Sequence, residues 1–172
     1  MGPKAFALKH ALRRPRDQTT HSSRSRSWPA KFGHSTANEM LQQIRKAREL
    51  DISYLPAIER AADRLFPEGR IPGPGSTSPT EDLLRALHDG LLLVAELDGV
   101  VVGFAVAGEL EHALHLYALA VHPDYARRGF GRGLVDGIIE ESARRALTGV
   151  TLTTFKDLSW NGPFYAQAGF RT

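Results

Sequence analysis

The segment from Leu114 to Val135 carries the residue types and the spacing best suited to chemistry. It predicts an apolar strand, a turn at Pro123, and a basic loop, Arg-Gly-Phe-Gly-Arg-Gly over residues 128–133, that leads into an amphipathic helix. Such a loop would bring consecutive backbone N–H groups to the helix N-terminus, where oriented amides and the helix dipole bind phosphate oxygens. Glycine in the loop would let the backbone approach a ligand without a Cβ in the way.

A Gly-x-Gly pair alone is typical of ordinary strand-to-helix turns, so the flanking residues decide its meaning. Neither the dinucleotide-binding fingerprint nor the Gly-Lys-Ser/Thr phosphate loop is present. The segment resembles instead the GNAT superfamily of acyl-coenzyme-A-dependent acetyltransferases, in which a strand ending in Leu-x-Val-His-Pro precedes Gln/Arg-x-x-Gly-x-Gly/Ala. The matching positions are Leu119, Val121, His122, Pro123, Gly129 and Gly131. The Gln/Arg position is Ala126, a departure of little consequence because backbone amides do most of the binding and Arg127 and Arg128 follow.

A second signature of the same superfamily, Tyr-x-x-x-Gly-Phe, matches Tyr165, Gly169 and Phe170. The resemblance covers roughly residues 44–170 and implies an α/β (α+β) GNAT fold, with a mixed central sheet flanked by helices. Family members continue past Gly-Phe with a strand hairpin that closes the sheet, whereas this sequence stops at Thr172. We therefore expect the last strands to be missing or supplied by a second chain, and an open sheet edge favours a homodimer.

Length and composition limit the classes of protein that this sequence can encode. Its 172 residues favour one domain with a real core. The absence of cysteine excludes disulfides, cysteine-ligated zinc and a cysteine acyl intermediate. No apolar run approaches the roughly 18 residues that span a bilayer, so we expect a soluble, cytoplasmic protein without a membrane partner.

The net charge of +3 divides unevenly along the chain. Residues 1–39 hold eight Lys/Arg and two acidic residues, whereas residues 40–172 hold fourteen Lys/Arg and seventeen acidic residues. The Arg/Ser-rich composition of 1–39 predicts a disordered extension, loosely similar to a transit peptide, or translation from a start upstream of Met40. Because the basic charge belongs to this extension, we expect no nucleic-acid-binding domain in 40–172.

Hydrophobic periodicity and turn residues predict the elements of residues 40–172. Asp51 is the expected cap of the first helix, and Asp98-Gly99 is a strong hairpin signal. The third predicted helix pairs Glu140 with Arg144 and Glu141 with Arg145 on its outer face. The expected strands are 41–47, 91–96, 100–107, 114–121 and 150–155, and the expected helices are 51–65, 80–88, 131–147 and 163–168.

The resemblance implies acetyl-CoA as co-substrate, with no metal, and assigns roles to individual residues. The backbone N–H of Leu119, at a strand bulge, would polarise the thioester carbonyl, and Val121 would pair with the pantetheine arm. Tyr165 would protonate the leaving thiolate, as a phenol with a pKa near 10 can. The predicted cofactor-binding residues are Leu119, Ala120, Val121, Ala126, Arg127, Arg128, Gly129, Phe130, Gly131, Arg132, Gly133, Asn161, Phe164 and Tyr165.

The general base is left open between two residues. His115 and Tyr117 alternate with apolar neighbours and are expected on one face of their strand. The run resembles arylalkylamine acetyltransferases, whose two relay histidines correspond to these positions, and only His115 is kept. Its pKa suits proton uptake at neutral pH, yet a satisfied histidine on a half-exposed strand is equally compatible. Glu59, on the first helix, is the rival, because that helix edges the acceptor site in several family members.

The sequence thus predicts an N-acetyltransferase that moves acetyl from acetyl-CoA directly to a primary amine, with a small molecule favoured over a protein as acceptor. The alternative is a non-catalytic acyl-CoA-binding or assembly domain with an incomplete acceptor site. The early C-terminal stop and the presence of Tyr117, where bacterial relatives usually have glutamate, keep that alternative open.

Overall fold

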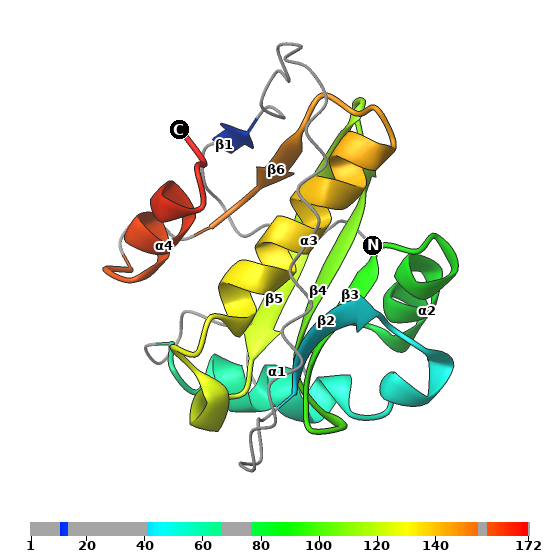
Figure 1. The fold of residues 1–172 in the computed structure, drawn as a ribbon, viewed down its shortest axis with the longest axis vertical. Helices are drawn as coiled ribbons and strands as arrows, with labels where there is room; N and C mark the ends of the chain where they lie inside the picture. Colours follow the sequence, from blue (N-terminus) through cyan, green and yellow to red (C-terminus); the bar gives the residue numbers. More distant parts are fainter. Residues whose placement is uncertain (1–10, 14–40, 67–76, 155–157, 172) are drawn as a thin grey trace, which may run out of the picture.

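The computed structural model describes residues 11–13, 41–66, 77–154 and 158–171 of the chain (Figure 1). The strands are β1 Ala11–Arg13, β2 Gln42–Lys46, β3 Leu92–Leu97, β4 Val100–Leu110, β5 Ala113–Val121 and β6 Val150–Leu152. The helices are η1 Glu49–Asp51, α1 Leu55–Asp63, α2 Thr80–His88, η2 Pro123–Tyr125, α3 Phe130–Arg144 and α4 Asn161–Gln167. The order of strands and helices predicted for residues 40–172 is therefore confirmed.

The strands form one mixed sheet in the order β1-β6-β5-β4-β3-β2. The pairs from β2 to β5 are antiparallel, whereas β5 and β6 are parallel, because α3 carries the chain back between them. The turn between β3 and β4 is the predicted hairpin, with both Asp98 and Gly99 at positive φ. β1 adds an antiparallel strand to β6, so these three residues differ from the disorder predicted for 1–39, and the rest of that segment lies outside the described residues.

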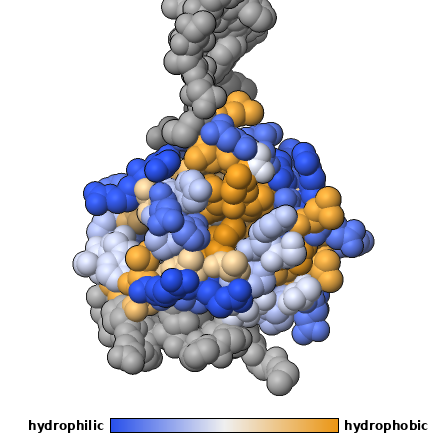
Figure 2. Space-filling view, turned by 90° about the horizontal axis from the view of Figure 1, so that it is seen from below, coloured by the Kyte–Doolittle hydropathy of each residue, from blue (hydrophilic) through white to orange (hydrophobic). Residues whose placement is uncertain are grey.

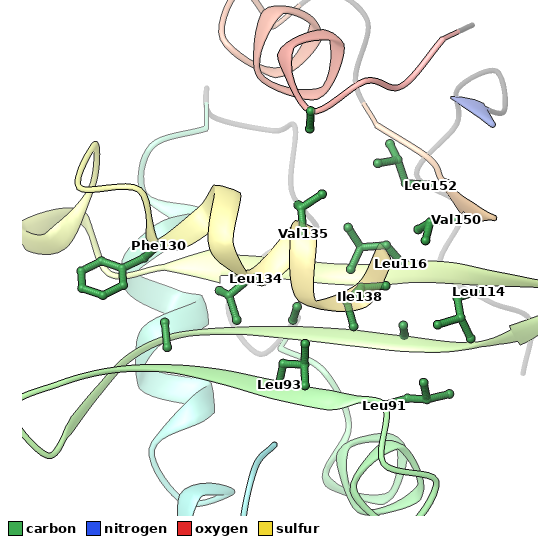
Figure 3. Close-up of a cluster of buried hydrophobic side chains, with 14 of the residues drawn as sticks. Leu91, Leu93, Leu114, Leu116, Phe130, Leu134, Val135, Ile138, Val150 and Leu152 are labelled. Carbon is green, nitrogen blue, oxygen red and sulfur yellow. The ribbon is translucent and has the colours of Figure 1, made fainter. Parts of the chain in front are cut away.

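Helices cover both faces of the sheet and divide the core into two clusters (Figure 1). The α3-side core lies between α3 and the sheet and is closed by the segment that follows α4 (Figure 3). The α1-side core lies between the other face and α1 with α2, where Leu55, Ile58 and Leu83 pack on Phe104. The largest buried side chains of the α3-side core include Leu91, Leu114, Leu134, Val135, Ile138 and Val150.

Two glycines let α3 lie close to the sheet. A Cβ on Gly133 would stand 3.0 Å from Ile44 Cγ1, and one on Gly137 would stand 2.8 Å from Leu93 Cδ1. Both glycines lie on the same face of the helix at a spacing of four residues. The approach of the helix axis to β2 and β3 therefore depends on the missing side chains.

A half-buried arginine, Arg45 on the edge strand β2, joins the sheet to η1. Arg45 Nε donates to Glu96 Oε2 at 2.8 Å, and its Nη1 donates to Asp51 Oδ2 at 2.7 Å. Asp51 also accepts from the backbone N–H of Arg48, and these hydrogen bonds lower the pKa of its carboxyl below 3.8. The prediction that Asp51 caps the first helix is wrong, because its carboxylate is used in η1 and α1 begins only at Leu55.

The predicted charge pairs of α3 are confirmed only in part. Arg145 Nε donates to Glu141 Oε1 at 2.7 Å, one turn away, as expected. Glu141 is buried rather than on the outer face, and it also pairs with Lys46 and Arg144. Arg144 thus finds its carboxylate at Glu141 and not at Glu140, because a carboxylate inside the protein needs more than one cation to offset its lost hydration.

Replacing Gly137 by valine tests the close approach of α3. The three added carbon atoms, a Cβ and two methyl groups, overpack the core against Leu93, so we expect the free energy of unfolding to fall by about 1–3 kcal/mol. Urea denaturation measures the change. The control is Gly162→Val, since a Cβ at Gly162 meets nothing within 4 Å, and it is expected to change stability by less than about 0.5 kcal/mol. Equal effects at both positions would contradict this account of the packing.

Acid titration tests the bond between Arg45 and Asp51. The pKa of Asp51 is lower in the folded than in the unfolded protein, so its ionisation stabilises the fold above pH 3.8 and that contribution is lost as the pH falls further. We expect Asp51→Asn to lower the free energy of unfolding at pH 7 and to flatten its dependence on pH below 3.8. An unchanged acid limb in the variant would rule out this source of acid sensitivity. Asp82→Asn, on the exposed face of α2, is the control.

Candidate active site

A cavity of about 160 Å³ opens between α1, β5, the end of β6 and α4. It contains the catalytic candidates Glu59, Leu119 and Tyr165 together, although they are more than 100 residues apart at the extremes. Its lining residues are Glu59, Ala62, Asp63, Phe66, Leu116, Tyr117, Ala118, Leu119, Ala120, Leu152, Thr153, Thr154, Asn161 and Tyr165.

The cavity exists because β5 leaves its partner β6 after Leu116. The two strands pair only at residues 114–116 of β5, and the β4–β5 register shifts at the same place, where Ala107 faces Leu116 but Val106 faces Ala118. Tyr117 is therefore the extra residue of a β-bulge, which bends the strand and increases its twist. Beyond the bulge, the side of β5 that faced β6 is open.

The bulge also exchanges the faces on which β5 side chains lie. Leu114 and Leu116 belong to the α3-side core, but Ala118 and Ala120, two and four residues later, belong to the α1-side core. A regular strand would have kept all four on one face. Leu119 consequently packs with the α3-side core, and Ala120 is buried in the α1-side core while it still borders the cavity.

The exposed Tyr117 ring lies over β4 at Gly108, where a Cβ would stand only 2.9 Å from the ring.

The open edge of β5 presents backbone N–H groups to the cavity side. The N–H of His122 donates to Val102 O at 2.8 Å, toward β4, and alternation along an antiparallel strand places the N–H of Ala120 on that side too. The N–H groups of Leu119 and Val121 point the other way, to the side that β6 has left. The bulge itself is at Tyr117, two residues before the position that the resemblance implied.

The loop after β5 leaves a continuous row of backbone donors. Every residue from 127 to 132 has a backbone N–H that donates to no group in the described part of the chain. Arg127 and Gly129 have φ values of 62° and 88°, and Gly129 begins α3 without a side-chain cap. Successive N–H groups in this geometry form an anion-binding concavity at a helix N-terminus.

Two of the predicted cofactor-binding residues have backbone amides that are engaged inside the protein. The N–H of Ala126 donates to Pro123 O at 3.0 Å, and the N–H of Gly133 donates to Gly129 O at 2.9 Å. Gly133 serves the packing of α3 instead. The guanidinium of Arg132 bonds to Asp136 and to the carbonyl of Gln167, so it ties α3 to α4.

Arg128, another basic side chain of the loop, lies over the ring of Tyr125 at 5.6 Å. Phe130 is buried in the α3-side core and anchors the first turn of the helix. A Cβ on Gly131 would touch the Phe164 ring at 3.4 Å, so α4 borders the loop from the side. Side chains therefore set the position of the row of donors, and the backbone supplies the donors themselves.

Figure 2 shows the lower end of the molecule as drawn in Figure 1, toward which β5 runs. Apolar residues gather in the middle of this face, and hydrophilic residues surround them.

Tyr165 lies in α4 with its ring between Phe164 and Phe170, at 4.9 Å and 5.8 Å between ring centres. Burial raises the pKa of Tyr165 to about 12, so the phenol keeps its proton throughout the physiological range. Asn161, at the start of the same helix, donates from Nδ2 to Thr154 Oγ1 at 2.9 Å and so joins α4 to the chain that follows β6. Both residues line the cavity.

The two candidate bases are placed differently. His115 is buried, its Nδ1 is 2.8 Å from Thr151 Oγ1 on β6, and its ring packs edge-on against Tyr117 at 4.9 Å. It lies beside Tyr117, as predicted, but it is absent from the cavity lining. Glu59 does line the cavity, and its carboxylate accepts from the N–H of Ser78 at 2.7 Å and from its hydroxyl at 3.0 Å.

Asp63 is a cavity residue that the sequence analysis missed. It is half-buried, and desolvation raises the pKa of its carboxyl above 3.8. It stands one helical turn after Glu59, so the spacing of four residues in the same amphipathic helix was the signal that could have found it.

A profile of the acetyltransferase (GNAT) family matches residues 55–170, which include every element of this site. The chain belongs to the GNAT acetyltransferase family. The resemblance drawn from the two sequence signatures is thereby confirmed, together with the GNAT fold.

Among curated proteins, an acetyltransferase of Yersinia pestis is 36% identical over 81 residues, which are 46% of this chain and 57% of that protein. The chain thus spans little more than half the length of the relatives that it matches. Among solved structures, the ribosomal-protein-S18-alanine N-acetyltransferase of Escherichia coli matches with a TM-score of 0.62 at 22% identity, over 76% of this chain and 78% of that one. The PaiA N-acetyltransferase of Thermoplasma acidophilum, in complex with coenzyme A, matches with a TM-score of 0.64 at 19% identity, over 77% and 91%.

None of the helices in the described residues is both long and apolar enough to cross a membrane. Within the same residues, no three His, Cys, Asp or Glu side chains gather as they would to hold a metal ion.

Proposed function

We propose that this protein is an N-acetyltransferase that transfers an acetyl group from acetyl-CoA directly to a small primary amine. The observation that carries the proposal is that the open edge of β5 is followed along the chain by residues 127–132, whose backbone N–H groups donate to no group among the described residues. An extended chain ending in a pyrophosphate fits such a path, because it can pair with a strand edge and place its phosphates at a helix N-terminus. Family membership and the solved relatives that hold coenzyme A support the same assignment.

The residues present fit this co-substrate. The N–H groups of 127–132 would bind the pyrophosphate oxygens, and the positive φ of Gly129 aims them into one concavity. The exposed guanidinium groups of Arg127 and Arg128 add positive charge beside it. The N–H of Val121 would pair with the pantetheine arm on the side that β6 has left.

Acetyl-CoA supplies an activated thioester, and the protein supplies orientation and polar contacts at the reacting atoms. The C–N bond forms as the C–S bond breaks, the amine gives up one proton, and the sulfur leaves as a thiolate. The N–H of Leu119 lines the cavity and would donate to the carbonyl oxygen as it gains negative charge. Alignment of the two substrates in one cavity contributes the largest share of the rate acceleration over the uncatalysed reaction.

Tyr165 would donate a hydrogen bond to the departing sulfur. Its pKa of about 12 lies well above that of a thiol, about 8.5, so complete transfer of the phenolic proton to the thiolate is uphill. The phenol therefore stabilises the thiolate while it keeps its proton. Of the two candidate bases, only Glu59 borders the cavity, which favours it over His115 for accepting the proton of the amine.

Binding of acetyl-CoA tests the first part of the proposal. Gly129→Val places a β-branched side chain at a φ of 88°, so we expect the loop to shift and the affinity measured by calorimetry to fall at least about tenfold. Gly99→Val is the matched control, because Gly99 has a φ of 82°, is equally open to solvent and lies in the β3–β4 hairpin, outside the loop of residues 127–132. No binding by the folded wild-type protein would refute the proposal. Equal loss in both variants would assign the effect to stability alone.

Turnover tests the second part. Removing the phenolic hydroxyl in Tyr165→Phe deprives the thiolate of its donor, and we expect kcat to fall by roughly 10²–10³-fold with little change in the affinity for acetyl-CoA. Because the pKa of Tyr165 is about 12, its ionisation is not expected to limit the wild-type rate between about pH 8 and pH 10. Binding of acetyl-CoA without turnover of any amine would favour the non-catalytic alternative.

A further inference from the structure

One wall of the cavity is formed by α1 and the residues that directly follow it. Glu59 and Asp63 lie on α1 at a spacing of four residues, and Phe66 lies just after the end of the helix. This wall carries two carboxylates, whereas no Lys or Arg borders the cavity among the described residues. An acceptor that enters here meets negative charge first.

The two carboxylates differ in their hydrogen-bond partners. Glu59 accepts two hydrogen bonds from Ser78, so it joins α1 to the segment that leads into α2. Asp63 has neither a hydrogen-bond donor nor an ion-pair partner for its carboxylate among the described residues, although it is half-buried. A desolvated carboxylate without a donor costs free energy, which is why burial raises the pKa of Asp63. A cationic ligand would offset that cost.

Aromatic side chains stand next to Asp63. Phe66, just after α1, and Tyr117, at the bulge of β5, both line the cavity. Trp160, at the start of α4, packs edge-on against Phe66 with 6.2 Å between the ring centres. Aromatic faces bind both apolar groups and ammonium ions, the latter through the negative charge of the ring face.

We propose that Asp63 binds the ammonium group of the acceptor, and that the acceptor is a small primary amine with an aryl or other apolar group and no carboxylate beside the amine. A carboxylate on the acceptor would be repelled by Asp63 and Glu59. Glu59 remains with Ser78 and has no part in recognising the ammonium charge. The proposal rests on the proposed function, since it names the substrate class of the same cavity.

The test compares Asp63→Asn with the wild-type protein, using 2-phenylethylamine as acceptor and acetyl-CoA as donor. Loss of a charge-assisted hydrogen bond is expected to raise the KM for the amine by about 10–100-fold. The KM for acetyl-CoA is expected to stay the same, because the proposed phosphate donors are the backbone N–H groups of residues 127–132 and not Asp63. Glu81→Gln, an exposed acidic residue at the start of α2, is the control and is expected to match the wild type.

Two further readouts separate recognition of charge from a structural role. The inhibition constant of 2-phenylethanol, the neutral counterpart of the amine, is expected to be the same for Asp63→Asn and the wild type. The melting temperature of Asp63→Asn is expected to be unchanged or higher, because its carboxylate is destabilised in the folded state. Equal losses of amine and alcohol binding would overturn the proposal in favour of a change in cavity shape.

The outcome for this inference can be told apart from the outcome for the proposed function. Calorimetric binding of 2-phenylethylamine to the protein saturated with coenzyme A tests Asp63 without any turnover. Binding that is lost in Asp63→Asn, with no acetylation, would support the ammonium site and refute the enzyme. Acetylation with the same amine KM in the wild type and in Asp63→Asn would refute the site and leave the enzyme standing. Absence of amine binding in the wild type would also overturn the site.

Discussion

The parting of β5 from β6 is the constraint on which the rest of this structure depends. A parallel strand pair normally satisfies the N–H groups of both strands, but here the bulge at Tyr117 ends the pairing after Leu116. The N–H of Leu119, a cavity residue, and the N–H of Val121 face the edge that β6 has left, where a ligand can do what β6 does for Leu114 and Leu116. A backbone N–H group that is buried in a sheet without a hydrogen-bond acceptor costs free energy of folding. Where a folded protein keeps such a group, it indicates a site for a ligand. The candidate active site is, in this sense, an interrupted part of the sheet.

The N-terminus of α3, the helix that follows β5, also offers backbone N–H groups to a ligand. Among the described residues, the N–H groups of residues 127–132 have no acceptor and no side chain caps α3 at Gly129. The helix is nevertheless held firmly, because Phe130 is buried at its start and Gly137 lets it lie close on β3. Arg132 ties it to α4, which carries Tyr165. The apolar packing therefore supports a row of donors that the protein itself does not use.

The charged side chains of the cavity also differ in whether they have hydrogen-bond partners among the described residues. Glu59 has donors from Ser78, and His115 has Thr151, so each of these sequence-predicted bases also serves to join two elements. Asp63 has neither a donor nor a cation among the described residues, and it lies where an acceptor would enter. A carboxylate that finds no partner within the fold is suited to finding one in a substrate. The site is thus distinguished less by which polar residues it contains than by which of them the fold leaves without partners.

The sequence by itself determined the elements and the family, because these depend on local patterns. Periodicity placed α2 at Thr80–His88, Asp98-Gly99 specified the hairpin, and the glycines and proline after β5 specified the turn into α3. It also brought Leu119, Gly129 and Tyr165 into one predicted site, since the two signatures fix their roles.

Only the tertiary structure decided where β5 bulges, because a one-residue shift of register arises from the pairing of two strands and any residue near Tyr117 could have been the extra one. It likewise decided that Asp51 bonds to Arg45, that His115 bonds to Thr151, and that Asp63 does not share the partner of Glu59. Those choices depend on contacts between segments far apart in the chain, which no local pattern records.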